Sequence, residues 1–393
     1  MKLSSLTPRS VANMGRTVAL TPFALILRKL KRHVWIITER PDQARDNGYC
    51  FFKYMKEQHP EQPVYYIIDK TAKDFRKVAP YGGIISFNSW RHYWYYCLAP
   101  IHISAHVGGC NPEHNPGAKR LKKMIRYKDV FLPHGVSYGI SEFCLAKYAK
   151  IDLFICSGKP EYDNVLTNYG YTPEQVVYTG FPRLDGWHNI TANPKQIVLM
   201  PTWRLYLAQN PDTVFEDTDY YKAYQSLINN RELIAFLLQH GLKLVFYLHH
   251  GMRRYVDAFH TDCPNIEVVY KDESYDIQEL LKESALLITD YSSVHFDFAY
   301  MEKPVLYYQF DYKEFWSKQY QQTDFDAAKD GFGPVAYDEN TLVRELKRAY
   351  EDDFKLQGEY LQRMKDFYVL YDDHNCQRVY QAICERLEGK LLT

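Results

Sequence analysis

Short apolar runs recur along the chain, and each is followed by polar residues and then by a helical pattern. Val34–Thr38 is the first such run, and Val305–Gln309 is the last. A run that is apolar without alternation indicates a strand buried on both faces. Apolar residues at spacings of three and four predict the helices between the runs, as over Trp90–Leu98. This rhythm predicts an α/β fold with parallel, doubly wound sheets.

The rhythm restarts after a polar linker at Asn189–Lys195. The strands predicted before the linker are Val34–Thr38, Pro63–Asp69, Gly83–Phe87, Ile101–Ala105, Asp129–Leu132, Leu153–Cys156 and Val176–Gly180. Those predicted after it are Gln196–Met200, Leu244–Leu248, Ile266–Val269, Ala285–Thr289 and Val305–Gln309. Longer helices are expected over Tyr224–His240, Leu342–Asp352 and Gly358–Leu387. A chain of 393 residues also favours two domains, which we place at 34–190 and 191–357.

Residues 1–33 differ from both predicted domains. Val18–Leu27 is mostly apolar but contains Pro22, and cations flank it at Arg9, Arg16, Arg28, Lys29, Lys31 and Arg32. An apolar helix face flanked by cations can lie in the interface of an anionic membrane. We therefore predict a membrane-associating segment, and the alternative is a solvated or domain-packing helix. No apolar run approaches the roughly 20 residues of a spanning helix.

Composition narrows the class of partner. The 48 Lys and Arg residues balance 48 Asp and Glu residues, which argues against a general nucleic-acid binder. A local basic run over Lys119–Lys128 is a solvated face or a contact for lipid headgroups or a polyanionic substrate. The eight cysteines include no C-x-x-C pair, so a zinc or redox motif is not expected.

Polar and special residues recur where predicted strands end. These clusters are His134-Gly135, Thr179-Gly180 with Arg183, Thr202 with Arg204, His249-His250, and Asp290 with Ser292-Ser293. In open α/β sheets ligands bind beyond the carboxyl ends of the strands, so the clusters predict a cleft between two Rossmann-like domains. The chain has neither G-x-G-x-x-G nor a P-loop motif, which argues against a dinucleotide enzyme or a P-loop NTPase.

The residue types in these clusters suit phosphate chemistry. His134 can take a proton from a hydroxyl, and the alternative is a satisfied structural imidazole. Arg183, Arg204 and His249 suit phosphate oxygens. Ser292 and Ser293 stand between a predicted strand and a short helix, where they can seat an anion or merely cap the helix.

Four segments resemble one known family. They are ARDNGYCFFKYM (44–55), TGFPRLD (179–185), MPTWR (200–204) and ITDYSSVHFDFAYMEKPVLYYQFD (288–311), and the His134-Gly135 and His249 segments fit the same pattern. Together they are similar to the CDP-glycerol glycerophosphotransferases, which include the primases and polymerases of wall teichoic acid and relatives that build phosphate-linked capsules. The resemblance covers roughly residues 34–385.

The resemblance implies a glycosyltransferase type B arrangement in which the C-terminal helix, 358–387, packs back on the first domain. It implies attack of a hydroxyl of a lipid-linked acceptor on the β-phosphate of CDP-glycerol, with release of CMP, at the cytoplasmic face of a bacterial membrane. It makes His134 the general base and His249 a contact for the donor phosphates. Further donor or substrate contacts fall at Gly135, Arg183, Thr202, Arg204, His250, Asp290, Ser292 and Ser293.

Two positions depart from the family pattern. Pro133 stands where glutamine often precedes the His-Gly pair, and His250 stands where proline often follows the second histidine. We favour His249 over His250 as the phosphate contact because it aligns with the motif.

No Asp/Glu cluster indicates a metal site, so we expect no obligatory protein-bound metal, although a divalent ion can accompany the diphosphate. The alternatives are a CDP-ribitol or other CDP-polyol donor, a nucleotide-sugar glycosyltransferase of the same fold, and a non-catalytic scaffold.

Overall fold

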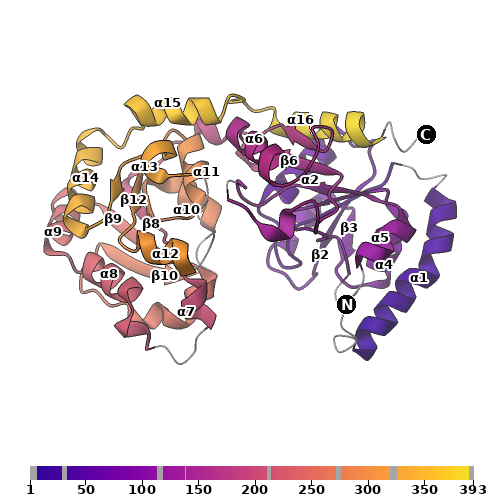
Figure 1. Cartoon of the computed structure of the whole chain (residues 1–393), viewed down its shortest axis with the longest axis horizontal. Coiled ribbons are helices and arrows are strands. Elements are labelled where there is room, and N and C mark those ends of the chain that lie inside the picture. Colours follow the sequence, from indigo (N-terminus) through magenta and orange to yellow (C-terminus); the bar gives the residue numbers. More distant parts are fainter. Residues whose placement is uncertain are drawn as a thin grey trace. The chain divides into compact units, whose positions relative to one another are not determined.

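The structure is a computed structural model that describes residues 7–28, 33–112, 118–137, 139–209, 214–270, 276–318 and 325–388 (Figure 1). The chain divides into two compact units, of which the first is Met1–Asp185 with Asp372–Thr393 and the second is Gly186–Tyr371. Each unit is built on one parallel sheet, so the predicted fold class of two Rossmann-like α/β domains is confirmed.

The first unit contains a seven-stranded parallel sheet in the order β3-β2-β1-β4-β5-β6-β7. Its strands are β1 Trp35–Thr38, β2 Val64–Ile68, β3 Ile84–Ser86, β4 Ile101–Ser104, β5 Lys128–Phe131, β6 Leu153–Cys156 and β7 Val176–Tyr178. Every residue of β1, β4 and β6 is buried, as expected for strands covered on both faces. All seven lie within or close to the predicted runs.

Helices connect these strands. They are α1 Pro8–Arg28, α2 Asn47–Gln58, α3 Phe75–Val78, α4 Trp90–Leu98, α5 Ala118–Ile125 and α6 Lys159–Asn168, with short turns η2 Ala79–Tyr81, η3 Glu142–Cys144 and η4 Pro182–Leu184. Asp46 and Ser89 begin α2 and α4 as N-caps, because each side chain accepts a hydrogen bond from a backbone N–H of its helix.

The second unit repeats the topology with six parallel strands in the order β10-β9-β8-β11-β12-β13. They are β8 Asn193–Leu199, β9 Lys243–Leu248, β10 Ile266–Tyr270, β11 Ser284–Thr289, β12 Val305–Tyr308 and β13 Val335–Ala336. The predicted linker over Asn189–Lys195 therefore runs into β8, which pairs with β11 from Asn193 onward.

The helices of the second unit include one difference from the sequence expectation. They are α7 Leu205–Gln209, α8 Asp219–Ile228, α9 Arg231–His240, α10 Ile277–Glu283, α11 Val294–Tyr300, α12 Tyr312–Lys318, α13 Ala327–Asp330, α14 Glu339–Glu351 and α15 Gly358–Phe367, with turns η5 Trp187–Asn189, η6 Phe215–Asp217 and η7 His250–Ala258. The single helix predicted over Tyr224–His240 is two helices, because Asn230 caps α9 through the backbone N–H groups of Glu232 and Leu233.

The C-terminal segment predicted as one helix is also two. Helix α15 packs against α11 in the second unit, whereas α16 Asn375–Ile383, which η8 Cys384–Glu388 continues, packs against α2 and η4 in the first. Backbone N–H groups of Asn375 and Cys376 donate to the two carboxylate oxygens of Asp185 at 2.9 and 3.0 Å, which anchors the start of α16. Only the second part of the predicted 358–387 helix belongs to the first unit.

Helix α1 lies along the first unit beside α4 and α5 (Figure 1). Its polar side faces inward. Its buried positions are Ser10, Asn13, Thr17, Thr21 and Ala24. Its exposed large apolar side chains are Val11, Val18, Phe23, Ile26 and Leu27, of which Phe23 and Ile26 are each 65% exposed. A helix of a water-soluble domain normally buries its apolar stripe, so this polarity is reversed.

Candidate active site

Each sheet has a topological switch point between two neighbouring strands, from which the chain continues toward opposite sides of the sheet. It falls between β1 and β4 in the first unit and between β8 and β11 in the second. Ligands of open α/β sheets bind beyond the carboxyl ends of the strands at such points. The segments after β1, β4 and β5, and those after β8, β9 and β11, are therefore the candidate site in each unit.

His134 follows β5 and is accessible to solvent. Its ring centroid lies 5.3 Å from that of His106, which follows β4, and the Nε of Arg40, which follows β1, lies 3.4 Å from His106 Nε2. The surrounding protein lowers the pKa of His134, and the nearby Arg183 and Arg40 cations lower it further, against an opposing effect of Asp46. His134 is thus neutral near pH 7, the form that can accept a proton.

The start of α2 fixes the segment that carries His134. The Asn47 side chain, fully buried, donates from Nδ2 to the Pro133 carbonyl at 2.6 Å and accepts from the Arg183 backbone N–H at 3.1 Å. Arg183 is also buried, and its guanidinium pairs with the Asp46 carboxylate at 2.8 Å. Asn47 thereby joins the residue before His134 to the segment after β7.

Two buried glutamates support the same edge of the sheet. Glu39 accepts from the backbone N–H groups of Arg45, Asp46 and Tyr49, and burial together with the Asp46 carboxylate raises its pKa to about 8. Glu161 accepts from the backbone of Ser137 at 2.5 Å and of Ser157 at 2.6 Å, and burial raises its pKa to about 7. The Glu161 contact with Ser137 holds the backbone just after the half-buried Gly135, and the Glu39 contacts hold the start of α2.

In the second unit Arg204 and Asp290 contact each other rather than solvent. Both are fully buried, and their ion pair is 2.9 Å long. Arg204 also pairs with Asp311 through Nη2 at 2.8 Å and through Nε at 2.9 Å. Its guanidinium lies over the rings of Tyr220, Tyr291 and Phe315, so carboxylates and aromatic faces surround the cation.

The Asp290 carboxylate also ties together the two strand ends at the switch point. It accepts from the backbone N–H of Thr202 at 2.7 Å and of Tyr291 at 2.6 Å. Thr202 is half-buried, as is Ser292, and Ser293 is exposed. Ser293 is the N-cap of the seven-residue helix α11 but makes no side-chain cap hydrogen bond. Ser292 and Ser293, rather than Arg204 or Asp290, are accessible to solvent, whereas the Thr202 hydroxyl is buried without a hydrogen-bond partner among the described residues.

His249 follows β9 and accepts a hydrogen bond at Nδ1 from the Gly251 backbone N–H, at 3.1 Å. The neutral ring therefore carries its proton on Nε2, which can donate to a phosphate oxygen. The ring stacks on Trp203 with centroids 5.4 Å apart, and a Cβ on Gly251 would lie 2.6 Å from the Trp203 ring. His250 begins η7, and its side chain lies outside the described residues.

The structure thus gathers His134, Gly135 and Arg183 at one edge of the first sheet, and Thr202, Arg204, Asp290, Ser292 and Ser293 at one edge of the second. Sequence reasoning missed His106, Asn47 and Asp311. His106 directly follows a predicted strand and could have been found by the rule that selected His134. Asn47 and Asp311 lie within the family motifs 44–55 and 288–311, but their roles depend on contacts with residues far away in the sequence. Among the described residues no group of three or more His, Cys, Asp or Glu is arranged to hold a metal ion.

The chain is similar to several known proteins. It is 32% identical over 374 residues to the minor teichoic acid biosynthesis protein GgaB of Bacillus subtilis (strain 168), covering 92% of this chain and 41% of that protein. It is 26% identical over 344 residues to the teichoic acid poly(glycerol phosphate) polymerase of the same strain, covering 79% of this chain and 43% of that protein. The chain therefore spans less than half the length of each of these relatives.

A solved structure of the wall teichoic acid polymerase TagF has the same fold. It matches with a TM-score of 0.66 and 17% sequence identity over 98% of this chain and 99% of that chain. The family model described as CDP-Glycerol:Poly(glycerophosphate) glycerophosphotransferase matches residues 19–385. The resemblance found in the sequence motifs is thereby confirmed, and the chain belongs to the CDP-Glycerol:Poly(glycerophosphate) glycerophosphotransferase family.

Proposed function

We propose that the chain transfers glycerol phosphate from CDP-glycerol to a hydroxyl of a lipid-linked acceptor and releases CMP, in the synthesis of a teichoic acid or capsule-type polymer. The observation that carries this proposal is a solvent-accessible histidine, His134, kept neutral at the carboxyl edge of the first sheet in a member of this family. His134 acts as the general base, and the second unit supplies the contacts to the donor.

The reaction requires one bond to form and one to break. The acceptor oxygen attacks the β-phosphorus, its proton passes to His134, and the bond between the β-phosphorus and the bridging oxygen breaks, so that CMP leaves with the electron pair. Such a transfer depends on in-line positioning and on stabilising charge on the non-bridging oxygens. His249 Nε2–H and the hydroxyls of Thr202, Ser292 and Ser293 suit that second role.

Arg204 and Asp290 have a different part in this proposal from the one expected from sequence. Because the two side chains are buried against each other, we assign them to holding the Thr202 and Tyr291 backbone in place. Arg183 is similarly engaged with Asp46. The sequence also predicts that Arg204, Asp290 and Arg183 contact substrate directly and that His250 contacts phosphate. These contacts stay predictions, as does the expectation that no protein-bound metal is required.

The test is CMP release from CDP-glycerol with a glycerophosphate-primed lipid acceptor. His134→Ala should lower the rate at least about a hundredfold, the lower end for loss of a general base. His260→Ala, which alters an exposed histidine after η7, is the matched control and should leave the rate unchanged. An equal rate for wild type and His134→Ala would refute the assigned role, and a panel with CDP-ribitol separates the donors.

We further propose that the chain is peripheral to the cytoplasmic face of the membrane through α1. The support is the reversed polarity of this helix. Contrary to the expectation from the sequence, Ser10–Arg28 has the length and composition of a membrane span, and only 28% of its most apolar stretch is buried against the unit. An interfacial helix exposes apolar side chains toward acyl chains in this way. Replacing Phe23, Ile26 and Leu27 by serine should abolish binding to phosphatidylcholine vesicles, and retained binding would overturn the proposal.

A further inference from the structure

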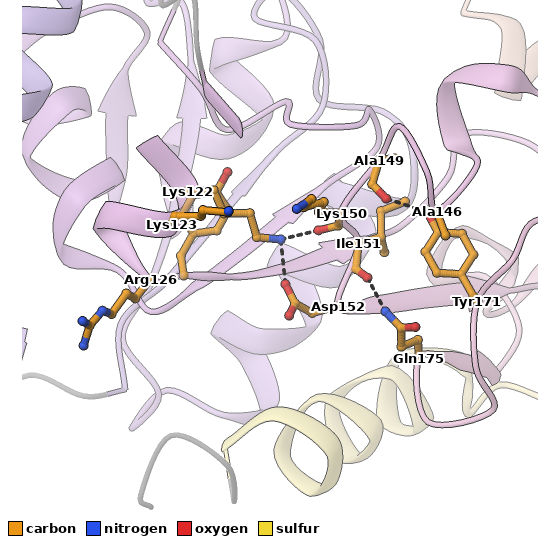
Figure 2. Close-up of a pocket in the computed structure, with 11 residues that line it drawn as sticks. Lys122, Lys123, Arg126, Ala146, Ala149, Lys150, Ile151, Asp152, Tyr171 and Gln175 are labelled. Carbon is orange, nitrogen blue, oxygen red and sulfur yellow. Dashed lines mark hydrogen bonds and ion pairs between the residues drawn. The ribbon is translucent and has the colours of Figure 1, made fainter. Parts of the chain in front are cut away.

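A pocket lined by basic side chains lies at the amino ends of β5, β6 and β7 (Figure 2). We call it the basic pocket, and its volume is about 490 Å³. Its cationic members are Lys122, Lys123, Arg126 and Lys150, and its only carboxylate is Asp152. Tyr127, Tyr171, Ile151 and two alanines add apolar surface. The volume is in the range of small-ligand sites, and the lining is more highly charged than in most of them.

The basic pocket is separate from the candidate active site. It lies where β5 begins, at Lys128, whereas His134 follows the end of β5. Since the strands are parallel, the two positions are at opposite edges of the sheet. The CDP-glycerol reaction assigned to the carboxyl edge therefore does not account for the cations of the pocket.

The charges in the basic pocket do not cancel. Asp152 is held by Lys122 at 2.7 Å and by Lys128 at 3.3 Å, and Figure 2 shows the Lys122 ammonium group also directed at the Lys150 carbonyl. Lys123, Arg126 and Lys150 are exposed, and none of the three pairs with a carboxylate of the described part of the chain. The net charge at the rim is positive, so an anion is favoured there.

Arg126 is held at the pocket in an unfavourable backbone conformation. Its φ is +57°, in the left-handed region where glycine is usual after a helix. A glycine at this position would relieve the strain and remove the charge at once. The guanidinium is therefore placed at the pocket by a position where glycine would strain the backbone less.

Helix α1 ends beside the same rim. The guanidinium of Arg28, its last residue, donates to the carbonyls of Ile125 at 2.7 Å and of Arg126 at 2.9 Å. The exposed apolar residues of the last turns of α1 precede this contact directly along the helix. A membrane in contact with those apolar side chains would therefore also lie next to the basic pocket.

We propose that the basic pocket binds the phosphodiester headgroup of an anionic phospholipid, with Lys123, Arg126 and Lys150 contacting the phosphate oxygens. This inference extends the proposed membrane contact of α1 and does not depend on the transfer reaction. Headgroup phosphates lie at the depth just outside the acyl region that an interfacial helix reaches. The phosphodiester of a soluble glycerol phosphate polymer has the same chemistry, and the proximity of α1 favours the lipid.

The experiment measures binding of the full chain to two kinds of vesicle, one of phosphatidylcholine alone and one of phosphatidylcholine and phosphatidylglycerol in equal parts. A basic residue near an anionic surface contributes roughly fivefold in affinity. The combined Lys123→Gln, Arg126→Gly and Lys150→Gln variant should therefore lose roughly a hundredfold in binding to the anionic vesicles. Its binding to phosphatidylcholine alone should not change.

Two controls separate this result from misfolding and from bulk charge. Arg126→Gly alone should raise the midpoint of thermal unfolding, yet weaken binding to anionic vesicles roughly fivefold. A variant with Lys329, Lys355 and Lys365 of the second unit changed to glutamine removes the same number of exposed charges away from the pocket. An equal loss of binding in that variant would overturn the proposal, because bulk charge would then suffice.

Soluble poly(glycerol phosphate) distinguishes the two sources of phosphodiester. If the pocket variant loses affinity for the soluble polymer but keeps its affinity for anionic vesicles, the pocket serves the polymer and the lipid proposal is wrong. The serine variant of α1 should weaken binding to both vesicle types, whereas the pocket variant affects only the anionic ones. Failure of the α1 proposal and failure of the pocket proposal therefore give different results.

Discussion

The two units share a strand order but use the polar residues at their carboxyl edges in different ways. In the first unit His134 and His106 lie at the edge, and the buried Asn47 and Glu39 hold the backbone beneath them. In the second unit the Arg204 cation is enclosed by carboxylates and aromatic rings. The same position in a Rossmann-like fold thus holds titratable chemistry in one unit and an internal ion-pair network in the other.

The difference shows that a polar residue at a strand end is ambiguous until its burial is known. A guanidinium enclosed by carboxylates fixes loop geometry, and burial without those partners would cost several kcal/mol. An imidazole in partial contact with solvent can exchange a proton. Substitution of Arg204 in the second unit should therefore act mainly on stability, and substitution of His134 in the first unit mainly on rate.

Arg204→Met should give the largest effect on stability. Removal of the guanidinium leaves Asp290 and Asp311 buried near each other, which should lower the free energy of unfolding by about 3–5 kcal/mol. Denaturant unfolding measures this value. Arg344→Met, which removes an exposed partner of Glu345, should change it by less than about 1 kcal/mol. A stable Arg204→Met protein that fails only to bind CDP-glycerol would instead favour direct donor contact.

Asn47→Ala should affect both stability and rate in the first unit. It leaves the Pro133 carbonyl and the Arg183 N–H without their partner, a loss of roughly 2–6 kcal/mol at about 1–3 kcal/mol for each unsatisfied group. The released Pro133 should also let His134 shift, so kcat should fall more than KM changes. Asn47→Asp keeps the acceptor for the Arg183 N–H but sets a buried carboxylate oxygen against the Pro133 carbonyl, so it should not restore the stability near pH 7. Asn229→Ala, at an exposed asparagine after α8, is the control, and a purely structural Asn47 would leave the pH profile of kcat unchanged.

The buried histidines predict acid sensitivity in each unit. Burial lowers the pKa of His92 in the first unit to about 4 and that of His295 in the second to about 3. The unfolded chain takes up a proton near pH 6.5, so the stability from each neutral ring is present above that pH and falls as the pH falls toward the folded value. Between pH 7 and 5 each histidine should account for about 2 kcal/mol.

The contribution of one histidine is isolated by comparing wild type with His295→Phe at each pH. Glu39 opposes the trend, because its raised pKa favours the folded state at lower pH. The difference between the two proteins cancels that opposing contribution. A difference that does not grow between pH 7 and 5 would show that His295 is not buried as a neutral ring.

Ser293→Ala should have the smallest effect on stability, within about 0.5 kcal/mol, because Ser293 makes no cap hydrogen bond. Asp338→Ala, which removes the cap of α14 to Thr341, should cost about 1 kcal/mol. If Ser293 contacts donor phosphate, its substitution should weaken CDP-glycerol binding while stability is kept. Loss of about 1 kcal/mol of stability in Ser293→Ala would mean that the serine caps α11.

Much of the fold could be predicted because buried parallel strands carry a local signal. Leu153–Cys156 and Trp90–Leu98 coincide with β6 and α4, and the family motifs fell at the strand ends that the topology brings together. The breaks within Tyr224–His240 and Gly358–Leu387 were missed, because hydrophobic periodicity does not register the polar contacts of Asn230 and Asp185 that fix the starts of α9 and α16. The sequence did not decide whether the basic run over Lys119–Lys128 is a solvated face or binds a ligand, because the exposure of its members depends on α1 and on the loop before β6.

The sequence by itself determined the two α/β units, the family and the chemical types at the strand ends, because strand burial and motif spacing are properties of neighbouring residues. Only the tertiary structure decided which of those residues face solvent. Burial of Arg204 requires Asp311, more than a hundred residues later, and placement of Pro133 requires Asn47. The inward polar face of α1 likewise depends on the α4 and α5 surfaces beside it. The free energy of a charged or polar group is set by its surroundings, and those are assembled only when distant segments pack together.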